Sequence, residues 1–192
     1  RAVNDLSREG HLIRRQGVGT FVAEPIIERQ LNQLTTLSEE LQKLGYTGLH
    51  SRLLGMYPFR ASPRIAELFN IRVGDPMLLV RRVRYTKDVP IAAQHIFFPG
   101  HLCAGLKPSD LEKGSLYQFF EERLRQPIKW GKQRIDAVAA TRYHAKWLEV
   151  APFSPLLKVT RQTYLADGQP FEFTKTYYRP DRYSYQVNLY RY

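Results

Sequence analysis

Two arginines lie two residues apart in an apolar segment, and their spacing indicates anion chemistry. Arg82 and Arg84 belong to the run 76–85, which reads as a strand, so both side chains point to the same face. Burying unpaired charges is costly, so these guanidiniums require carboxylates or an anionic ligand. A guanidinium binds a carboxylate or a phosphate through two parallel hydrogen bonds. The pair therefore predicts either an anion site or a surface pair bridged to Asp or Glu.

Two predicted helix starts carry hydroxyl side chains. Thr36 with Glu39, and Ser115 with Gln118, fit the capping-box spacing. The free N–H groups at a helix start favour anions, although ordinary caps show the same pattern. Together with the two arginines, these helix starts form a candidate anion-binding site.

The strand that holds the arginines belongs to a unit that occurs twice. Residues 76–98 read as strand, turn and strand, and the pattern returns at 155–178, where Arg161 aligns with Arg82. The match extends back to residues 61–71 and 140–150. A repeat of about 80 residues is too long for a solenoid and indicates one duplicated unit within a single domain. Three of the differences between the copies fall where a site is expected: Arg84 against Thr163, Ala92 against Glu172, and Gln94 against Thr174.

Each half reads as helix, strand, helix and hairpin. The first helix of the first half spans 34–45, and long strands are expected at 48–60 and 127–140. The short helices that follow begin at Ser62 and Thr141, which are favourable N-caps. Residues 184–192 alternate with period two and predict a closing strand. Antiparallel hairpins with segregated helices make the fold class α+β.

The N-terminal region has a different character. Residues 1–9 show helical spacing with Gly10 as a C-cap, and residues 11–22 predict a β-hairpin with a basic, glycine-containing tip. The helix has no N-cap, so we expect a piece of a longer chain. Residues 23–33 read as a linker in which Ile26 and Ile27 form a strand.

Composition limits the function classes. The formal net charge is +11, of which residues 1–30 carry only +1, so the duplicated region is basic and suits phosphate backbones or a small anion. No apolar run approaches the ~18 residues of a membrane span. The single Cys103 excludes an internal disulfide, and the scattered histidines predict neither a metal site nor a cofactor. We expect a cytoplasmic protein that does not bind membranes.

The N-terminal motif resembles the end of a winged helix-turn-helix of the GntR family of transcription regulators. The resemblance is carried by Ala2, Val3, Leu6, Glu9, Gly10, Leu12, Arg14, Gly17, Gly19, Thr20, Phe21 and Val22. Residues 30–192 resemble the UTRA effector domain of the HutC-type subfamily, which has a chorismate-lyase-like fold. The resemblance implies a winged-helix remnant at 1–24, a linker at 25–33, and an effector-binding and dimerisation domain at 34–192.

The resemblance also implies how the hairpin meets operator DNA. Gly17 and Gly19 would bring the backbone close to the minor groove, next to Thr20. Arg14 and Arg15 would contact phosphates, which positions a protein without reading sequence, and Arg1 would act likewise. Since the base-reading start of the recognition helix is not among these residues, we expect the chain alone to bind DNA weakly.

For the effector domain, the resemblance implies an anionic ligand. Arg82, Arg84, Thr36 and Ser115 would hold its charged group, and Glu172 and Tyr178 would bind the remainder. Relatives commonly have Glu where this chain has Gln94, which leaves open a phosphosugar or another small anion, such as an aromatic or dicarboxylic acid. A homodimer is implied by the family and by two-fold operators.

Two alternatives stay open. Chorismate lyase shares the implied fold, so a lyase-like enzyme with Glu172 as its acid is the main rival, although the hairpin at 10–22 has no evident use in an enzyme. No motif places a histidine beside a serine or cysteine nucleophile. A general nucleic-acid-binding module would use the basic charge and the tyrosine-rich C-terminal residues as a stacking surface. The sequence favours a ligand-responsive transcription regulator, acting as a repressor.

Overall fold

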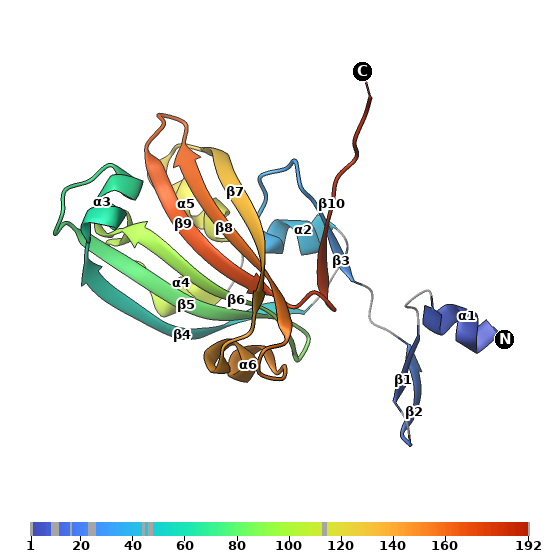
Figure 1. The fold of residues 1–192 in the computed structure, drawn as a ribbon. Coiled ribbons are helices and arrows are strands. Elements are labelled where there is room, and N and C mark those ends of the chain that lie inside the picture. The colour runs from blue at the N-terminus through green and yellow to red at the C-terminus, as the bar shows by residue number, and fades with distance from the viewer. Residues whose placement is uncertain are drawn as a thin grey trace. The chain divides into compact units, whose positions relative to one another are not determined.

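The computed structural model describes residues 2–8, 12–15, 17–22, 26–43, 45, 48–112 and 115–191, and it divides the chain into two compact units (Figure 1). One unit comprises residues 1–31 and 181–192, and the other comprises residues 32–180. The sequence predicts one domain over 34–192, whereas residues 181–192 lie with the first unit. The roles assigned to the two units stay predictions.

The first unit contains one helix and two small sheets. Helix α1 spans Ala2–Arg8, and strands β1 (Leu12–Arg15) and β2 (Gly19–Val22) form the predicted antiparallel hairpin. Strand β3 (Ile27–Gln30) pairs in parallel with β10 (Tyr183–Gln186). The helix, the hairpin and the strand at Ile27 are thus confirmed, while Gly10 lies outside the described residues. The predicted closing strand is wrong beyond Gln186.

The second unit is built on one antiparallel sheet of six strands in the order β4-β5-β6-β9-β8-β7. Alternation of apolar and polar side chains, and many β-branched and aromatic residues, favour strands in these segments. Their bounds are β4 Leu49–Arg60, β5 Pro76–Thr86, β6 Val89–Pro99, β7 Ile128–Ala139, β8 Pro155–Leu165 and β9 Pro170–Tyr178.

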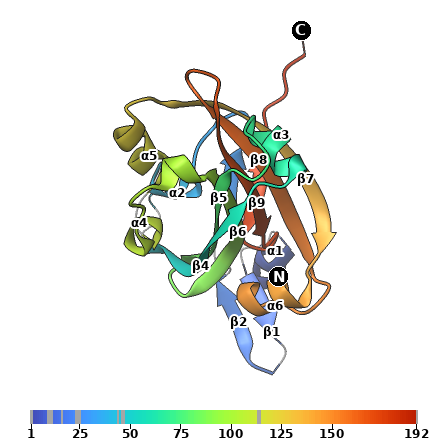
Figure 2. The ribbon, with the colours of Figure 1, turned by 90° about the vertical axis from the view of Figure 1, so that its left-hand side faces the viewer.

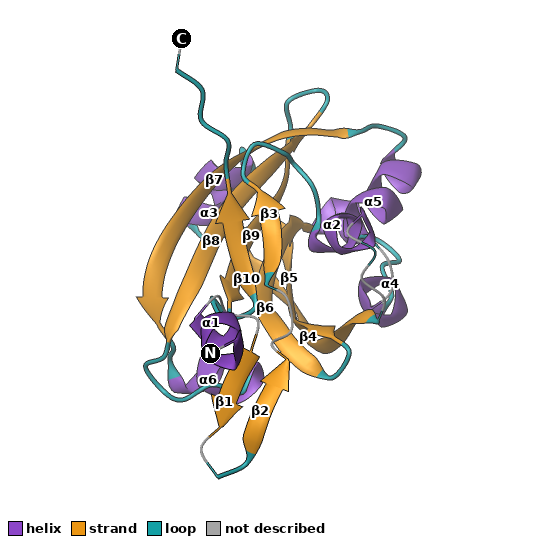
Figure 3. Cartoon of the chain, turned by 90° about the vertical axis from the view of Figure 1, so that its right-hand side faces the viewer, coloured by secondary structure: helices purple, strands orange, loops and turns teal. Residues whose placement is uncertain are grey.

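Helices of this unit cover both faces of the sheet. The helical elements are α2 Leu37–Lys43, α3 Pro63–Phe69, the 3₁₀ turn η1 Gly100–Cys103, α4 Pro108–Glu112, α5 Leu116–Leu124 and α6 Arg142–Leu148. Figure 2 and Figure 3 show α2, α4 and α5 gathered on one face, with α3 and α6 on the other. The main core packs β5, β6 and β9 against α4 and α5, with Phe98, Phe120 and Phe171 in mutual contact. Neither η1 nor α4 was predicted.

The two halves of the sheet are related by a local two-fold axis. The first half contains α2, β4, α3, β5 and β6; the second contains α5, β7, α6, β8 and β9; α4 lies in the connection. His95 and Lys175 correspond in the repeat and also pair directly across β6 and β9, so the axis passes between them. The sequence repeat is therefore confirmed as a structural duplication, and the α+β class is confirmed with it.

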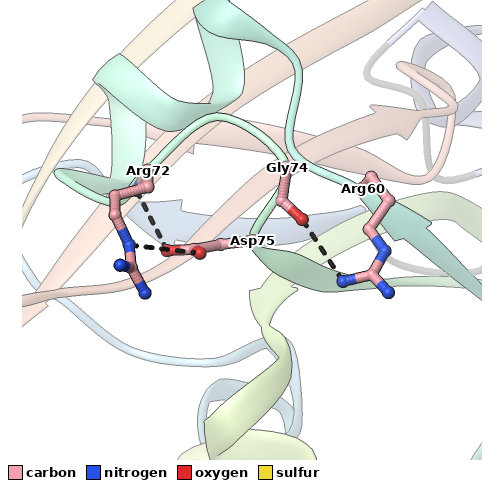
Figure 4. A network of polar contacts seen from close by, with 4 residues as sticks. All are labelled: Arg60, Arg72, Gly74 and Asp75. Carbon is pink, nitrogen blue, oxygen red and sulfur yellow. Dashed lines mark hydrogen bonds and ion pairs between the residues drawn. The ribbon is translucent and has the colours of Figure 1, made fainter.

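The correspondence extends to turn conformations. Ser62 and Thr141 cap α3 and α6 through their side chains, as predicted, and the helices end at Asn70 and Glu149, which share the left-handed conformation. The next turn contains Gly74 in the first half, where Arg72 binds Asp75 and Arg60 donates to the Gly74 carbonyl (Figure 4). In the second half the equivalent of Gly74 is Phe153, which also has a positive φ of 66°.

Candidate anion-binding site

Pairing among the central strands places Arg82 and Arg84 in two neighbouring rows of side chains that run across the sheet. Arg82 on β5 lies opposite Gln94 on β6, which lies opposite Thr176 on β9. In the next row with the same orientation, Arg84 lies opposite Ala92, which lies opposite Tyr178. Since residues two apart on a strand share a face, both rows face the α2, α4 and α5 side.

Arg82 is buried and held by two neutral acceptors. Its side chain is 6% exposed. Nε donates to Oε1 of Gln94 at 2.9 Å, and Nη1 donates to the carbonyl of Leu111 in α4 at 2.8 Å. The amide of Gln94 donates in turn to Oγ1 of Thr176 at 3.4 Å. These contacts fix the direction of the guanidinium without neutralising it.

Arg84 is more deeply buried and less well satisfied. It is 3% exposed, and Nη2 donates to Oγ of Ser38 in the first turn of α2 at 2.7 Å. Its Nε is buried and has no hydrogen-bond partner. Across the described part of the chain, neither Arg84 nor Arg82 forms an ion pair with a carboxylate. The surface-pair interpretation is therefore wrong, because these charges are internal and unneutralised.

The electrostatics of the pair agree with that geometry. Burial lowers the pKa of Arg82 well below its usual value, and the nearby charge of Arg84 lowers it further, while Glu172 acts in the opposite direction. Burial also lowers the pKa of Arg84 to about 10. Guanidinium groups stay protonated in proteins, so an anion placed between these two would relieve the cost of burying like charges.

The two predicted helix starts meet at their hydroxyl groups. Thr36 caps α2 in the predicted capping box, since its N–H donates to Glu39 at 2.8 Å and its hydroxyl accepts from the N–H of Glu39 at 3.2 Å. Ser115 caps α5, and its Oγ lies 3.3 Å from Oγ1 of Thr36 and donates to Glu39 at 2.8 Å. The second box is only half formed, because the side chain of Gln118 donates to Glu122 instead.

The remaining predicted ligand residues lie on the last strand. Glu172 is buried, accepts a hydrogen bond from the hydroxyl of Tyr117 at 2.7 Å, and has its pKa raised by burial. Tyr178 is also buried and shares the row of Arg84. Its position next to Ala92 places a phenol two strands away from the guanidinium.

The structure connects these residues through α2. Ser38, which contacts Arg84, lies in the same helix turn as Glu39, which contacts both helix starts. Residues near the site that the sequence analysis did not assign to it are Ser38, Glu39, Tyr117 and Arg161. The repeat could have identified Arg161, whereas nothing in the sequence indicated that Tyr117 would meet Glu172.

The predicted DNA-contacting residues lie on the hairpin of the first unit. Arg14 on β1 is exposed and opposite Thr20, and Arg15 is opposite Gly19. Gly17 and Gly19 have φ values of 75° and 139°, a region that favours glycine. Arg1 lies outside the described residues. Tyr178 and Tyr183 are buried, so they do not belong to an exposed stacking surface.

No three His, Cys, Asp or Glu side chains in the described ranges are grouped as a metal ion requires. Within the same ranges, every helix is too short or too polar to cross a membrane.

Comparisons with known proteins agree with one another. A family model described as the UTRA domain matches residues 46–184. The chain is 33% identical over 184 residues to the HTH-type transcriptional repressor NagR of Bacillus subtilis (strain 168), a match that covers 96% of this chain and 75% of NagR.

Solved structures have the same fold. PhnF from Mycobacterium smegmatis superposes with a TM-score of 0.80 at 23% identity, over 98% of this chain and 82% of PhnF. A GntR-family transcriptional regulator from Enterococcus faecalis V583 superposes with a TM-score of 0.66 at 26% identity, over 72% of this chain and 99% of that one. NagR and the Enterococcus faecalis protein are named as transcriptional regulators, so the lyase-like enzyme is set aside. The chain belongs to the UTRA-domain family of GntR-type transcriptional regulators.

Proposed function

We propose that this chain senses a small anionic metabolite and acts as the effector-binding part of a cytoplasmic transcriptional repressor. The observation that supports this most directly is the pair of buried guanidiniums, Arg82 and Arg84, which have no carboxylate partner among the described residues. A buried charge without a counterion favours binding of an anion. The hydroxyls of Thr36 and Ser115 supply further donors, connected to Arg84 through α2.

The proposed ligand has an anionic group and a polar remainder. Arg82 and Arg84 bind the anionic group, such as the phosphate of a phosphosugar or a carboxylate. Glu172, Tyr178 and Gln94 bind the remainder through hydrogen bonds. Gln94 is already an acceptor for Arg82, so its amide N–H₂ is the group that faces a ligand acceptor in place of Thr176.

A ligand screen tests the anion site. We expect a phosphosugar, or an aromatic or dicarboxylic acid, to raise the thermal midpoint, since a ligand at 100 times its dissociation constant adds about 2.7 kcal/mol of stability. Arg84→Ala should abolish the shift and leave the fold intact. Arg72→Ala, which removes an equal charge on the exposed turn after α3, is the matched control. Retained affinity in Arg84→Ala would contradict the assignment.

The proposal includes a second copy of the chain and operator DNA. Two-fold operators require paired DNA-binding heads, so a homodimer follows from the role rather than from a contact described above. An effector that prefers one arrangement of the heads would shift the population towards it. Light scattering that gave a monomer mass at micromolar concentration would contradict the dimer.

The hairpin of the first unit is proposed to contact the DNA backbone through Arg14, Arg15, Thr20 and the main chain near Gly17 and Gly19, with Arg1 nearby. Phosphate contacts position a protein and make its affinity depend on salt. In a protein that joins this hairpin to a whole winged helix-turn-helix, Arg14→Gln should weaken binding to all sequences equally and reduce the salt slope by about 1. A change in sequence preference would contradict a phosphate contact.

A further inference from the structure

A cavity of about 450 Å³ lies on the face of the sheet that carries α3 and α6, away from Arg82 and Arg84. It lies beside α3, above strands β6, β9, β8 and β7. Phe97 and Phe173 line it on the sheet side, and Ile65 and Leu68 line it from α3. Its volume is within the usual range for small-molecule sites.

Five cationic side chains line this cavity and come from four different elements. They are Arg64 on α3, Lys132 and Arg134 on β7, Lys158 on β8 and Lys175 on β9. Arg134 forms an ion pair with Asp136 at 3.1 Å, while the other four have no such partner within the described ranges. The cavity therefore has a large excess of positive charge.

These cations are close enough to affect one another. The pKa of Lys175 is lowered, first by burial and then by the charges of Lys158 and Arg64. The ammonium group of Lys175 lies 5.7 Å from the ring centroid of Phe97 and 5.9 Å from that of Phe173. Lys175 thus lies over the rings of Phe97 and Phe173, with the charges of Lys158 and Arg64 nearby. A bound anion would stabilise all three cations.

The equivalent place in the other half of the sheet carries different side chains. Through the repeat, Arg64 corresponds to Tyr143, Leu68 to Trp147 and Lys158 to Leu79. There, Arg81 lies under Tyr143 at 5.9 Å and next to Tyr57 at 5.1 Å, so aromatic rings cover its charge. Aromatic rings thus cover the cation in one half, whereas at the same place in the other half the cations line a cavity.

We propose that this cavity binds a small polyanion with two or more phosphate groups, at a site separate from the effector site. One phosphate would lie among Lys158, Lys175 and Arg64, and a second would reach Lys132 and Arg134 on the outer strand. Lysine and arginine bind phosphate through charge-assisted hydrogen bonds. Thr160, also in the lining, offers a neutral donor between the two groups of cations.

Inorganic tripolyphosphate is the probe for this site, with orthophosphate for comparison. By calorimetry at low salt, we expect tripolyphosphate to bind at least about tenfold more tightly than orthophosphate, because it spans both groups of cations. The double variant Lys158→Gln/Lys175→Gln should weaken tripolyphosphate binding by at least about tenfold. Arg64→Gln, on the exposed face of a short helix, should also weaken tripolyphosphate binding without affecting the sheet. This single variant tests the site if the double variant folds poorly.

Two control variants distinguish this site from its alternatives. Lys107→Gln/Lys129→Gln removes the same charge from exposed positions outside the cavity and should change the affinity less than about twofold. Arg84→Ala should leave tripolyphosphate binding unchanged. Equal losses in the control would show diffuse attraction, and loss in Arg84→Ala would place the anion in the effector site. A double variant that changes the association state but keeps its affinity would make this face an interface between copies. Each of these three results would overturn the proposal.

Discussion

Arg82 and Arg161 occupy equivalent positions in the two halves of the sheet, and each donates to a main-chain carbonyl in the segment that leads into the first helix of the opposite half. Nη1 of Arg82 lies 2.8 Å from the carbonyl of Leu111, ahead of α5, and Nη1 of Arg161 lies 3.0 Å from the carbonyl of Thr35, ahead of α2. Each guanidinium is also bound by a glutamine on the neighbouring strand, Gln94 or Gln133. The pair joins the two halves reciprocally.

Loss of Arg161 should therefore destabilise the fold. Arg161→Met removes at least three hydrogen bonds from a buried side chain, including two to Gln133. Since buried polar groups that lose their partners are costly, we expect the free energy of unfolding to fall by about 2–4 kcal/mol. Urea denaturation followed by circular dichroism measures this change.

Arg84→Met is the matched comparison. Arg84 makes one hydrogen bond, to Ser38, and its Nε is buried without a partner. Replacing an uncompensated buried charge by an apolar side chain is often neutral or stabilising, so the loss should stay below about 1 kcal/mol. A loss as large as that of Arg161→Met would show that Arg84 has a structural role and would weaken its assignment to ligand binding.

Glu39 places a negative charge beside the hydroxyls that are proposed to bind the effector. Glu39→Gln keeps the capping-box geometry, because glutamine serves at this position, but removes the charge. We expect affinity for an anionic effector to rise about three- to tenfold, with little change in stability. Titration calorimetry gives the affinity, and Glu122→Gln on the exposed side of α5 is the control. A weaker complex in Glu39→Gln would mean that the carboxylate itself binds the ligand.

Phe153 is strained where its equivalent is glycine. Phe153 has a φ of 66° and is 80% exposed, and Gly74 holds the same turn position in the first half with a φ of 87°. Glycine adopts this conformation without the steric cost of a Cβ atom. Phe153→Gly should raise the free energy of unfolding by about 1 kcal/mol, and Gly74→Phe should lower it by a similar amount. Thermal denaturation of both variants checks the pair, and a destabilised Phe153→Gly protein would show that the ring makes a contribution in solution.

His95 should make stability depend on pH. Burial, followed by the charge of Arg81, lowers its pKa from 6.5 to about 4. Between these values the unfolded chain binds a proton that the folded chain does not, so the free energy of unfolding falls as pH falls from 6.5 towards 4.

The contribution of His95 is measured as the difference between the stability profiles of the parent and of a His95 variant. Burial raises the pKa of Glu172, so this residue has the opposite effect: it lowers the free energy of unfolding as pH rises above the usual pKa of a glutamate. His95→Asn should flatten the fall in stability between pH 6.5 and 4 relative to the parent, while His101→Gln, at an exposed position, should not. Parallel profiles for the parent and His95→Asn would exclude His95 as the source.

Much of the fold could be predicted because its signals are local. Alternation defined the strands, Ser62 and Thr141 defined the helix starts, and the repeat gave the duplication. The predicted strand at 184–192 failed beyond Gln186 because a strand needs a partner, and β3 ends at Gln30, which pairs with Gln186. The alternation of Val187 and Leu189 has no strand to pair with in the described residues.

The site was predictable only in part. That Arg82 and Arg84 share a face follows from the period of a strand. Their acceptors do not, because the Leu111 carbonyl and Ser38 come from segments 29 and 46 residues away in the chain. Tyr117 reaches Glu172 across 55 residues for the same reason. Contacts of this kind depend on how helices lie on the sheet, which residue spacing does not determine.

The duplicated sheet has a consequence for the direction in which a molecule can lie across it. Ala92 and Glu172 correspond in the two halves, as do Arg84 and Thr163, so a nearly symmetric scaffold carries a cation beside a methyl group on one side and an acid beside a hydroxyl on the other. A ligand that spans both halves must itself have two different ends, because the same ligand turned end for end would place its anionic group against the carboxylate of Glu172. The repeated frame is nearly symmetric, and these two pairs of unlike residues give it polarity.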